Sequence, residues 1–168
     1  EIAYAAHDVD DGLRSGLLDV AALQDVALLA RHRGQALSQH PQLAQAGDRR
    51  LLAETLRRML SAQIADVVRA TSAALGAHAP AHADAVRGLP PLVVFSPDMR
   101  SEATALKRFL FSSLYRHPTV TQTTDRARAV VRGLYAAYAA VPAELPAEHR
   151  AALDRHGPRA LADYIAGM

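Results

Sequence analysis

The sequence predicts an all-α protein of about seven helices, and three observations carry that prediction. Half of the residues are hydrophobic, yet alanine supplies much of that share and aromatic residues make up only 5% of the chain. Alanine favours helices, whereas β-branched residues and glycines, which favour strands and turns, are comparatively few. Apolar residues recur at three- and four-residue spacing along most of the chain, and one short apolar run resembles a strand. With 168 residues, the chain is long enough to bury a sizeable core.

The first predicted helix covers residues 1–16, EIAYAAHDVDDGLRSG. At about 100° per residue, one narrow apolar stripe runs along it and suits burial against a core. The stripe consists of Ile2, Ala6, Val9 and Leu13. Tyr4 and Asp8 lie one turn apart on the opposite, acidic side. That side is either the solvated face of a surface helix or part of a binding site.

Gly16 is a plausible stop signal, after which residues 17–33 carry a second helical pattern. Residues 34–47 contain glutamine, histidine and proline, which indicates a broken helix or a loop around His40 and Pro41. Asp48 is a suitable N-cap for a long helix over about residues 49–75.

The middle of the chain is predicted to be irregular. Residues 76–91 hold several glycines and prolines and are expected to form a surface connection. The apolar run at 92–95 is either an extended segment or a buried linker. Ser96 then acts as an N-cap with Pro97 at the first helical position, or the helix begins instead at a cap on Ser101.

The second important helix is predicted over residues 102–116. Its buried stripe consists of Leu106, Phe109, Leu110 and Leu114. Lys107, Phe111 and Tyr115 follow each other at successive turns on another face. The helix is expected to end at His117, because a residue that precedes a proline disfavours helical dihedral angles.

The last part of the chain is predicted to hold three helices. Threonines at 121–124 cap the first, which covers 125–140. Its inward-facing residues are expected to be Val130, Val131, Leu134 and Tyr138. Two shorter helices follow at 148–155 and 159–166, split by Gly157 and its following proline.

Composition excludes several classes of protein. No cysteine is present, so neither a disulfide nor a thiolate metal site is possible. No apolar run approaches the roughly 20 residues that span a bilayer, and we expect no membrane partner. The net charge is +2 with acids interleaved among bases, which makes nucleic acid an unlikely partner. Lys107 is the single lysine among 19 basic residues, and a compact ammonium is not interchangeable with a guanidinium at a phosphate site. Because the chain opens at Glu1 inside a helical pattern, we expect a piece of a longer, cytoplasmic protein.

The segment EIAYAAHDVDDGLRSGLL resembles the helix that ends the HD domain of bacterial deoxyguanosine triphosphate triphosphohydrolase-like proteins. The stretches LVVFSPDM, ALKRFLFSSLYRHPTV, TDRARAVVRGLYAAY and ADYIAGM resemble, in order, the phosphohydrolase-associated region that forms the family's C-terminal half. SLYRHP and ADYIAGM are the more specific of these, and residues 20–47 match weakly. The resemblance implies the end of an HD domain and its following helix at 1–33, a connecting segment at 34–48, and a helical phosphohydrolase-associated region at 49–168.

The resemblance implies that the complete protein is a metal-dependent, nucleotide-binding hydrolase, a dGTPase-like dNTP triphosphohydrolase. Such an enzyme converts a deoxynucleoside triphosphate to deoxynucleoside and tripolyphosphate. The cofactor is expected to be a divalent metal, Mg²⁺ or Mn²⁺ with iron or zinc as alternatives, whose ligands all lie upstream of Glu1. We therefore do not assign His7 and Asp8 as a metal-binding pair, and we expect no catalytic or metal-ligating residue in this chain. The expected partners are the substrate, the upstream HD segment and further copies in a homo-oligomer.

Six substrate-contacting residues follow from the same resemblance: Tyr4, Asp8, Lys107, Tyr115, Arg116 and His117. The first two would face the deoxyribose, with the carboxylate accepting a hydrogen bond from the 3′-hydroxyl. The lysine would contact the triphosphate, and the second tyrosine would face the sugar or base. The last two are weaker candidates for phosphate or base edges. Two structural alternatives remain, an aromatic core filler at Tyr115 and a helix C-cap at His117. The alternative function is a helical interaction module without catalytic activity, in which these side chains would diverge in space.

Overall fold

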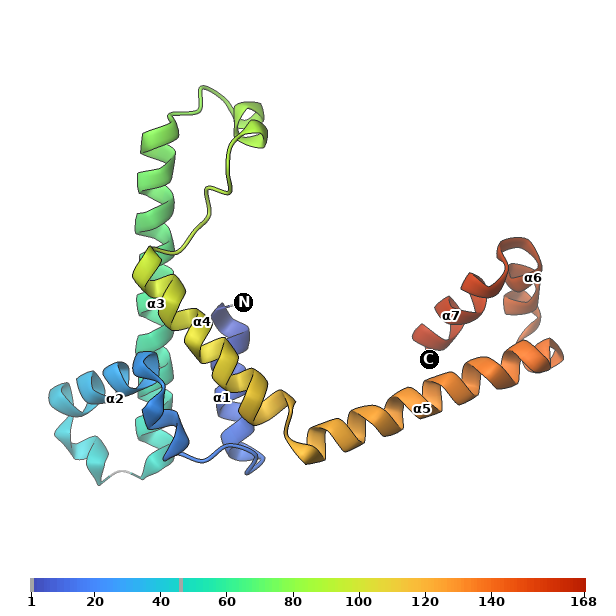
Figure 1. Ribbon diagram of the computed structural model, residues 1–168, viewed down its shortest axis with the longest axis horizontal. Coiled ribbons are helices and arrows are strands. Elements are labelled where there is room, and N and C mark those ends of the chain that lie inside the picture. Colours follow the sequence, from blue (N-terminus) through green and yellow to red (C-terminus); the bar gives the residue numbers. More distant parts are fainter. Residues whose placement is uncertain (1, 46) are drawn as a thin grey trace. The chain divides into compact units, whose positions relative to one another are not determined.

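A computed structural model describes residues 2–45 and 47–168, and every regular element in them is helical (Figure 1). Seven α-helices follow one another: α1 (Ile2–Arg14), α2 (Ala27–Gln39), α3 (Asp48–His78), α4 (Pro97–Leu110), α5 (Pro118–Ala140), α6 (Ala147–His156) and α7 (Pro158–Ala166). Short 3₁₀ segments lie at Ala22–Asp25, Pro41–Ala44, Ala83–Gly88 and Pro142–Glu144, and a π-helical turn, η4, covers Phe111–Tyr115. No strand occurs in these ranges, which confirms the all-α prediction. None of the helices described is both long and apolar enough to cross a bilayer.

The chain forms two compact units, the first ending at His117 and the second beginning at Pro118. In the first unit, α1 and α2 pack on α3, and α4 packs on α1 and α2. Their core gathers the fully buried side chains of Val9, Leu28, Met59, Leu106 and Leu110. In the second unit, α7 packs on both α5 and α6. The predicted division at 34–48 follows family regions rather than compactness, and it stays a prediction.

Helix α1 carries the apolar face that its spacing predicts. Ala6 and Val9 are buried, whereas Ile2 and Leu13 at the ends of the stripe are half-buried. The helix ends near Gly16, whose φ of 71° places it in the left-handed region that favours glycine. The predicted stop signal is therefore present.

Helix α2 differs from its prediction at both ends. It begins at Ala27 rather than near residue 17, because the intervening backbone folds back on α1: the N–H groups of Leu17 and Leu18 both donate to the carbonyl of Gly12 at 2.9 Å. It also continues past the predicted end at residue 33, through Gly34 to Gln39, and the break lies at His40 and Pro41, where it was predicted. A single glycine costs a helix only about 1 kcal/mol relative to alanine, which packing against α3 offsets.

The cap of α3 corrects the prediction, whereas the cap of α4 confirms one of the two predicted alternatives. Gly47, with φ of 86°, is the N-cap of α3, and Asp48 is the first helical residue instead. Ser96 does cap α4, since its Oγ accepts from the N–H of Met99 at 3.3 Å. Helix α4 therefore begins at Pro97, five residues before the predicted start at 102, and the cap at Ser101 is not used.

Helix α5 is longer and more exposed to solvent than predicted. It begins at Pro118, so the threonines predicted as caps lie inside it, where Thr123 Oγ1 donates to the carbonyl of Thr119 at 2.8 Å. No residue of α5 is buried, and the side chains of Val130 and Val131 are 56% and 52% exposed. The prediction that these valines face inward is wrong for this chain. A helical period defines an apolar face, but it does not supply the surface that covers it.

Candidate functional site

Four of the six predicted site residues line one pocket in the first unit, with a volume of about 530 Å³. Helix α1 supplies Tyr4 and Asp8, α4 supplies Lys107, and the π turn supplies Tyr115. The remaining lining residues are Ala5, Thr104, Arg108, Leu110 and Phe111. Segments about a hundred residues apart in sequence thus contribute to one concave site of a size suited to a small ligand. Whether the four residues contact substrate stays a prediction.

The central polar contact of the pocket joins Tyr115 to Asp8. The phenolic hydroxyl of Tyr115 donates to Oδ2 of Asp8. This hydrogen bond to a carboxylate, together with partial burial, raises the pKa of Tyr115 to about 12. The phenol is therefore protonated at neutral pH, and it holds the carboxylate in place beside the pocket.

The π turn explains how Tyr115 reaches helix α1. In an uninterrupted α-helix, eight residues would place Tyr115 about 80° around the axis from Lys107. The turn is closed by a bond from the N–H of Arg116 to the carbonyl of Phe111 at 3.1 Å, five residues back. The extra residue reduces the rotation by about 100°, so that Tyr115 lies within about 20° of Lys107. Single π turns recur at functional sites, where they redirect one side chain.

Aromatic and cationic side chains surround the rest of the pocket. Tyr4 is 75% exposed and Phe111 is 53% exposed. The guanidinium carbon of Arg116 lies 4.9 Å from the centroid of the Phe111 ring, a cation–π distance. Lys107 and Arg108 follow each other on α4 and both line the pocket.

Arg116 and His117 are the two predicted site residues that lie outside the pocket lining described. Arg116 reaches the site through its contact with Phe111. The backbone N–H of His117 donates to the carbonyl of Leu114 at 3.1 Å, which is how a residue that closes a helix end behaves. Sequence reasoning left out Arg108 and Phe111, although Phe111 lay on the face predicted for Lys107 and Tyr115.

The described residues do not assemble a metal site. No group of three His, Asp or Glu side chains in residues 2–45 and 47–168 gathers closely enough to hold a metal ion. Consecutive acidic residues on α1, such as Asp10 and Asp11, point in different directions because they share one helical turn. We therefore assign no chemical step through a metal held by these residues.

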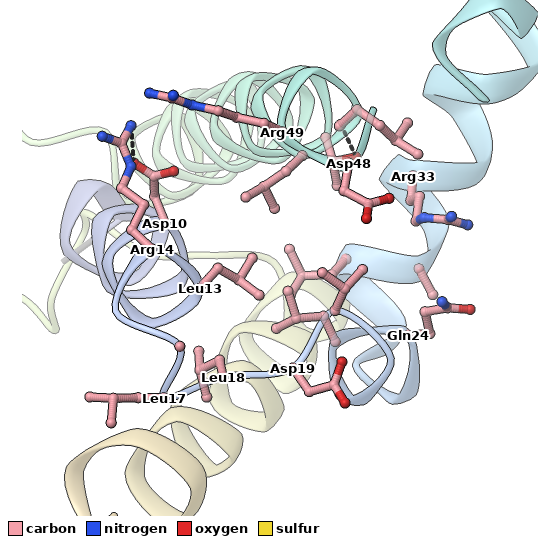
Figure 2. Close-up of a pocket in the computed structure, with 18 residues that line it drawn as sticks. Asp10, Leu13, Arg14, Leu17, Leu18, Asp19, Gln24, Arg33, Asp48 and Arg49 are labelled. Atoms are coloured by element: carbon pink, nitrogen blue, oxygen red, sulfur yellow. Dashed lines mark hydrogen bonds and ion pairs between the residues drawn. The ribbon is translucent and has the colours of Figure 1, made fainter. Parts of the chain in front are cut away.

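A second cavity, of about 660 Å³, lies between the end of α1, α2 and the start of α3. Leucine side chains form most of its floor, and charged residues stand around its rim (Figure 2). Asp10 is ion-paired with Arg14 at 2.7 Å, and the carboxylate of Asp19 accepts from the N–H of Ala21 at 2.9 Å. None of the six residues predicted to contact substrate lines this cavity, so it is not the site that the resemblance implies.

Comparison with known proteins finds one domain family and several relatives that the chain resembles. The phosphohydrolase-associated domain family matches residues 93–168. Deoxyguanosinetriphosphate triphosphohydrolase-like proteins from Bordetella pertussis, Ralstonia nicotianae and Thiobacillus denitrificans are 46%, 45% and 43% identical to it over 168 residues. These matches cover the whole chain but 43%, 43% and 44% of the three relatives, so the chain spans less than half the length of the curated relatives it matches. The chain is thus similar over its whole length to deoxyguanosinetriphosphate triphosphohydrolase-like proteins, and its residues 93–168 match the phosphohydrolase-associated domain family.

Proposed function

We propose that this chain supplies the sugar- and phosphate-contacting side of a deoxynucleoside triphosphate triphosphohydrolase. The observation that carries the proposal is the shared pocket of Tyr4, Asp8, Lys107 and Tyr115. The relatives' names support a phosphohydrolase, and the mixture of rings, a carboxylate and cations suits a molecule with a sugar and a polyphosphate.

In the proposed reaction, a water oxygen bonds to the α-phosphorus and the bond from phosphorus to the 5′-oxygen breaks. The 5′-oxygen takes up a proton, so the products are a deoxynucleoside and tripolyphosphate. A divalent metal held by the upstream HD segment would polarise the phosphate and activate the water. The residues of this chain bind and orient: Lys107 neutralises the triphosphate, and Asp8, held by Tyr115, accepts from the 3′-hydroxyl.

Tyr4 has a separate proposed role beside the sugar. Its ring is 75% exposed and lines the pocket one helical turn before Asp8. A ring packed on the deoxyribose would leave no room for a 2′-hydroxyl, which would favour deoxynucleotides over ribonucleotides. Tyr4→Ala is expected to narrow that preference, as measured by the ratio of kcat/KM values for a deoxynucleotide and its ribonucleotide.

Tripolyphosphate release with Mn²⁺ or Mg²⁺ tests the proposed reaction. We expect these 168 residues to bind a deoxynucleoside triphosphate weakly without hydrolysing it, and a protein extended upstream by the HD segment to turn over. In the extended protein, Asp8→Asn removes the charge of an acceptor and Lys107→Ala removes a charged donor. Each is expected to lower kcat/KM by roughly 10- to 100-fold, the range for hydrogen bonds that involve a charged group. Asp11→Asn, on an exposed part of the same helix, is the matched control. No turnover in the extended protein would contradict the reaction, and robust turnover by the 168 residues alone would contradict the upstream metal site.

The competing function is a helical interaction module without catalysis. One observation favours it: the bare apolar side chains of α5, including Val130 and Val131, lie outside the pocket. Within the proposed function, we assign such surfaces to the upstream HD segment and to further copies in a homo-oligomer. Light scattering after size-exclusion chromatography distinguishes a monodisperse monomer, which contradicts the oligomer, from a larger assembly.

A further inference from the structure

Phe111 differs from the other phenylalanines of the chain. The sequence contains three, and Phe95 and Phe109 pack against the core of the first unit. Phe111 instead leaves more than half of its side chain exposed, at 53%, and lines the 530 Å³ pocket. Because an exposed phenyl ring forgoes about 1.5–3 kcal/mol of burial, a ring held at the wall of a binding pocket is a candidate contact surface for a ligand.

One contact holds the Phe111 ring, and a backbone hydrogen bond fixes the turn that carries it. The guanidinium of Arg116 lies 4.9 Å from the ring centroid, and the backbone N–H of Arg116 donates to the carbonyl of Phe111 at 3.1 Å. The hydrogen bond that closes the π turn therefore joins the same two residues that form the cation–π pair. Because the turn fixes the backbone and the guanidinium lies against the ring, the ring is preorganised and loses little conformational freedom when a ligand packs against it.

The roles assigned so far leave the flat faces of the nucleobase with one ring, that of Tyr115, whose hydroxyl is bonded to Asp8. A deoxynucleoside triphosphate consists of a polyphosphate, a sugar and a flat aromatic base. Lys107 is assigned to the first part, and Tyr4 with Asp8 to the second. The base requires a π-face or an apolar wall, and Phe111 provides that surface beside Tyr115 in the same pocket.

We infer that Phe111 is a further substrate-contacting residue, a platform on which the nucleobase stacks, with Arg116 as the residue that positions its ring. The inference rests on the proposed function, because it assumes that the ligand is a deoxynucleoside triphosphate. Every base presents a π-face, so the stack contributes affinity without choosing among the bases. Loss of the ring therefore weakens all four deoxynucleoside triphosphates alike.

The experiment uses the 168-residue chain and the triphosphate of 2-aminopurine deoxyriboside, whose fluorescence is quenched on stacking. Binding is measured independently by equilibrium dialysis, and tripolyphosphate serves as a ligand that lacks a base. Phe111→Leu keeps an apolar side chain without a π-face, and Phe111→Tyr keeps the ring. We expect quenching in the wild type and in Phe111→Tyr, and its loss in Phe111→Leu together with roughly 5- to 100-fold weaker binding of the nucleotide. Tripolyphosphate binding is expected to be equal in all three proteins.

The outcomes separate the two proposals. Equal nucleotide binding and equal quenching in Phe111→Leu would overturn the stacking platform and leave the proposed function standing. Weaker tripolyphosphate binding in Phe111→Leu would also overturn it, since the substitution would then have disturbed the pocket as a whole. No nucleotide binding by the wild-type chain would overturn both.

For the positioning role, Arg116→Gln should reduce quenching while Arg100→Gln, a substitution of an exposed arginine on α4, should not. Unchanged quenching in Arg116→Gln would remove that role.

Discussion

At the scale of single residues, the contact between Tyr115 and Asp8 is the most informative part of the site. The carboxylate accepts a hydrogen bond from the phenol, and this raises the pKa of Tyr115 from 10.0 to about 12. An amide at position 8 still accepts a hydrogen bond, but it carries no charge to disfavour the phenolate. Asp8→Asn is therefore expected to return the pKa of Tyr115 toward 10, whereas Asp11→Asn should leave it unchanged.

Ultraviolet absorbance of tyrosinate, with the spectrum of Tyr115→Phe subtracted, measures this titration. The pKa of Tyr115 is higher in the folded state than in the unfolded state, so its hydrogen bond stabilises the fold fully below pH 10. This stabilisation is lost as pH rises toward 12. The wild type should thus lose stability relative to Tyr115→Phe across that interval. An ordinary pKa for Tyr115 in the wild-type chain would show that the contact is absent in solution.

Asp66 is a second residue whose charge has a structural role. It is 4% exposed, and its carboxylate accepts from the N–H of Ser96 at 2.8 Å, from the hydroxyl of Ser96 at 2.8 Å and from Arg69 at 3.1 Å. Burial raises the pKa of Asp66, but these hydrogen bonds outweigh it and hold the pKa below its ordinary value. The carboxylate thereby fixes the start of α4 against α3.

Asp66→Asn is expected to lower the free energy of unfolding by about 2 kcal/mol, since hydrogen bonds to a charged group contribute roughly 1.5–3 kcal/mol. Urea denaturation at pH 7 measures the change, with Asp98→Asn on the exposed first turn of α4 as a control. Because the folded-state pKa is depressed, the stability is present above the unfolded pKa of about 3.8 and is lost as pH falls through the folded value. Equal stability of Asp66→Asn and wild type at pH 7 would refute this role.

At the scale of elements, the π turn at Phe111–Tyr115 makes a prediction that an ordinary helix would not. Deletion of the exposed Ser112 should convert the turn to α-helix and place Tyr115 seven positions after Lys107, which preserves their common face. The deletion variant should therefore retain the raised pKa of Tyr115. Insertion of one alanine after Ser112 should abolish it, because the rotation then changes by a further 100° or so. Loss of the raised pKa in the deletion variant and its retention in the insertion variant would refute this account.

Helix α4 and its π turn show how much of the site could be predicted from the sequence. Periodicity and prolines predict that α4 exists and that Leu106 and Leu110 are buried, and both are. They also place Lys107 and Tyr115 on one face. In an uninterrupted helix, however, the two residues would lie about 80° apart around the axis. No local pattern signals the π turn, because the extra residue is accommodated through packing of Leu114 and the bond to Asp8. The broad composition of the pocket was predictable from the resemblance, whereas its exact angular arrangement and the exposure of Phe111 were not.

At the scale of the whole molecule, the two units differ in how much they bury. The first contains a continuous core to which α1, α2, α3 and α4 contribute. The second buries Leu145 and Leu161, at 3% and 2% exposure, while α5 buries no residue. Burial of apolar area is the main favourable term in folding, so the second unit gains much less free energy to offset its loss of conformational entropy.

Hydrogen exchange followed by mass spectrometry should therefore find two stabilities rather than one. Amides of α5, α6 and α7 are expected to exchange through openings of lower free energy than those of α1, α3 and α4. Leu161→Ala should accelerate exchange in residues 118–168 alone, because it removes one of the few side chains that hold α7 to its neighbours. Leu106→Ala should cost the first unit about 2–5 kcal/mol, the usual range for a fully buried leucine, without changing exchange in the second. A single cooperative transition, in which either substitution accelerates exchange throughout the chain, would mean that the two units fold as one.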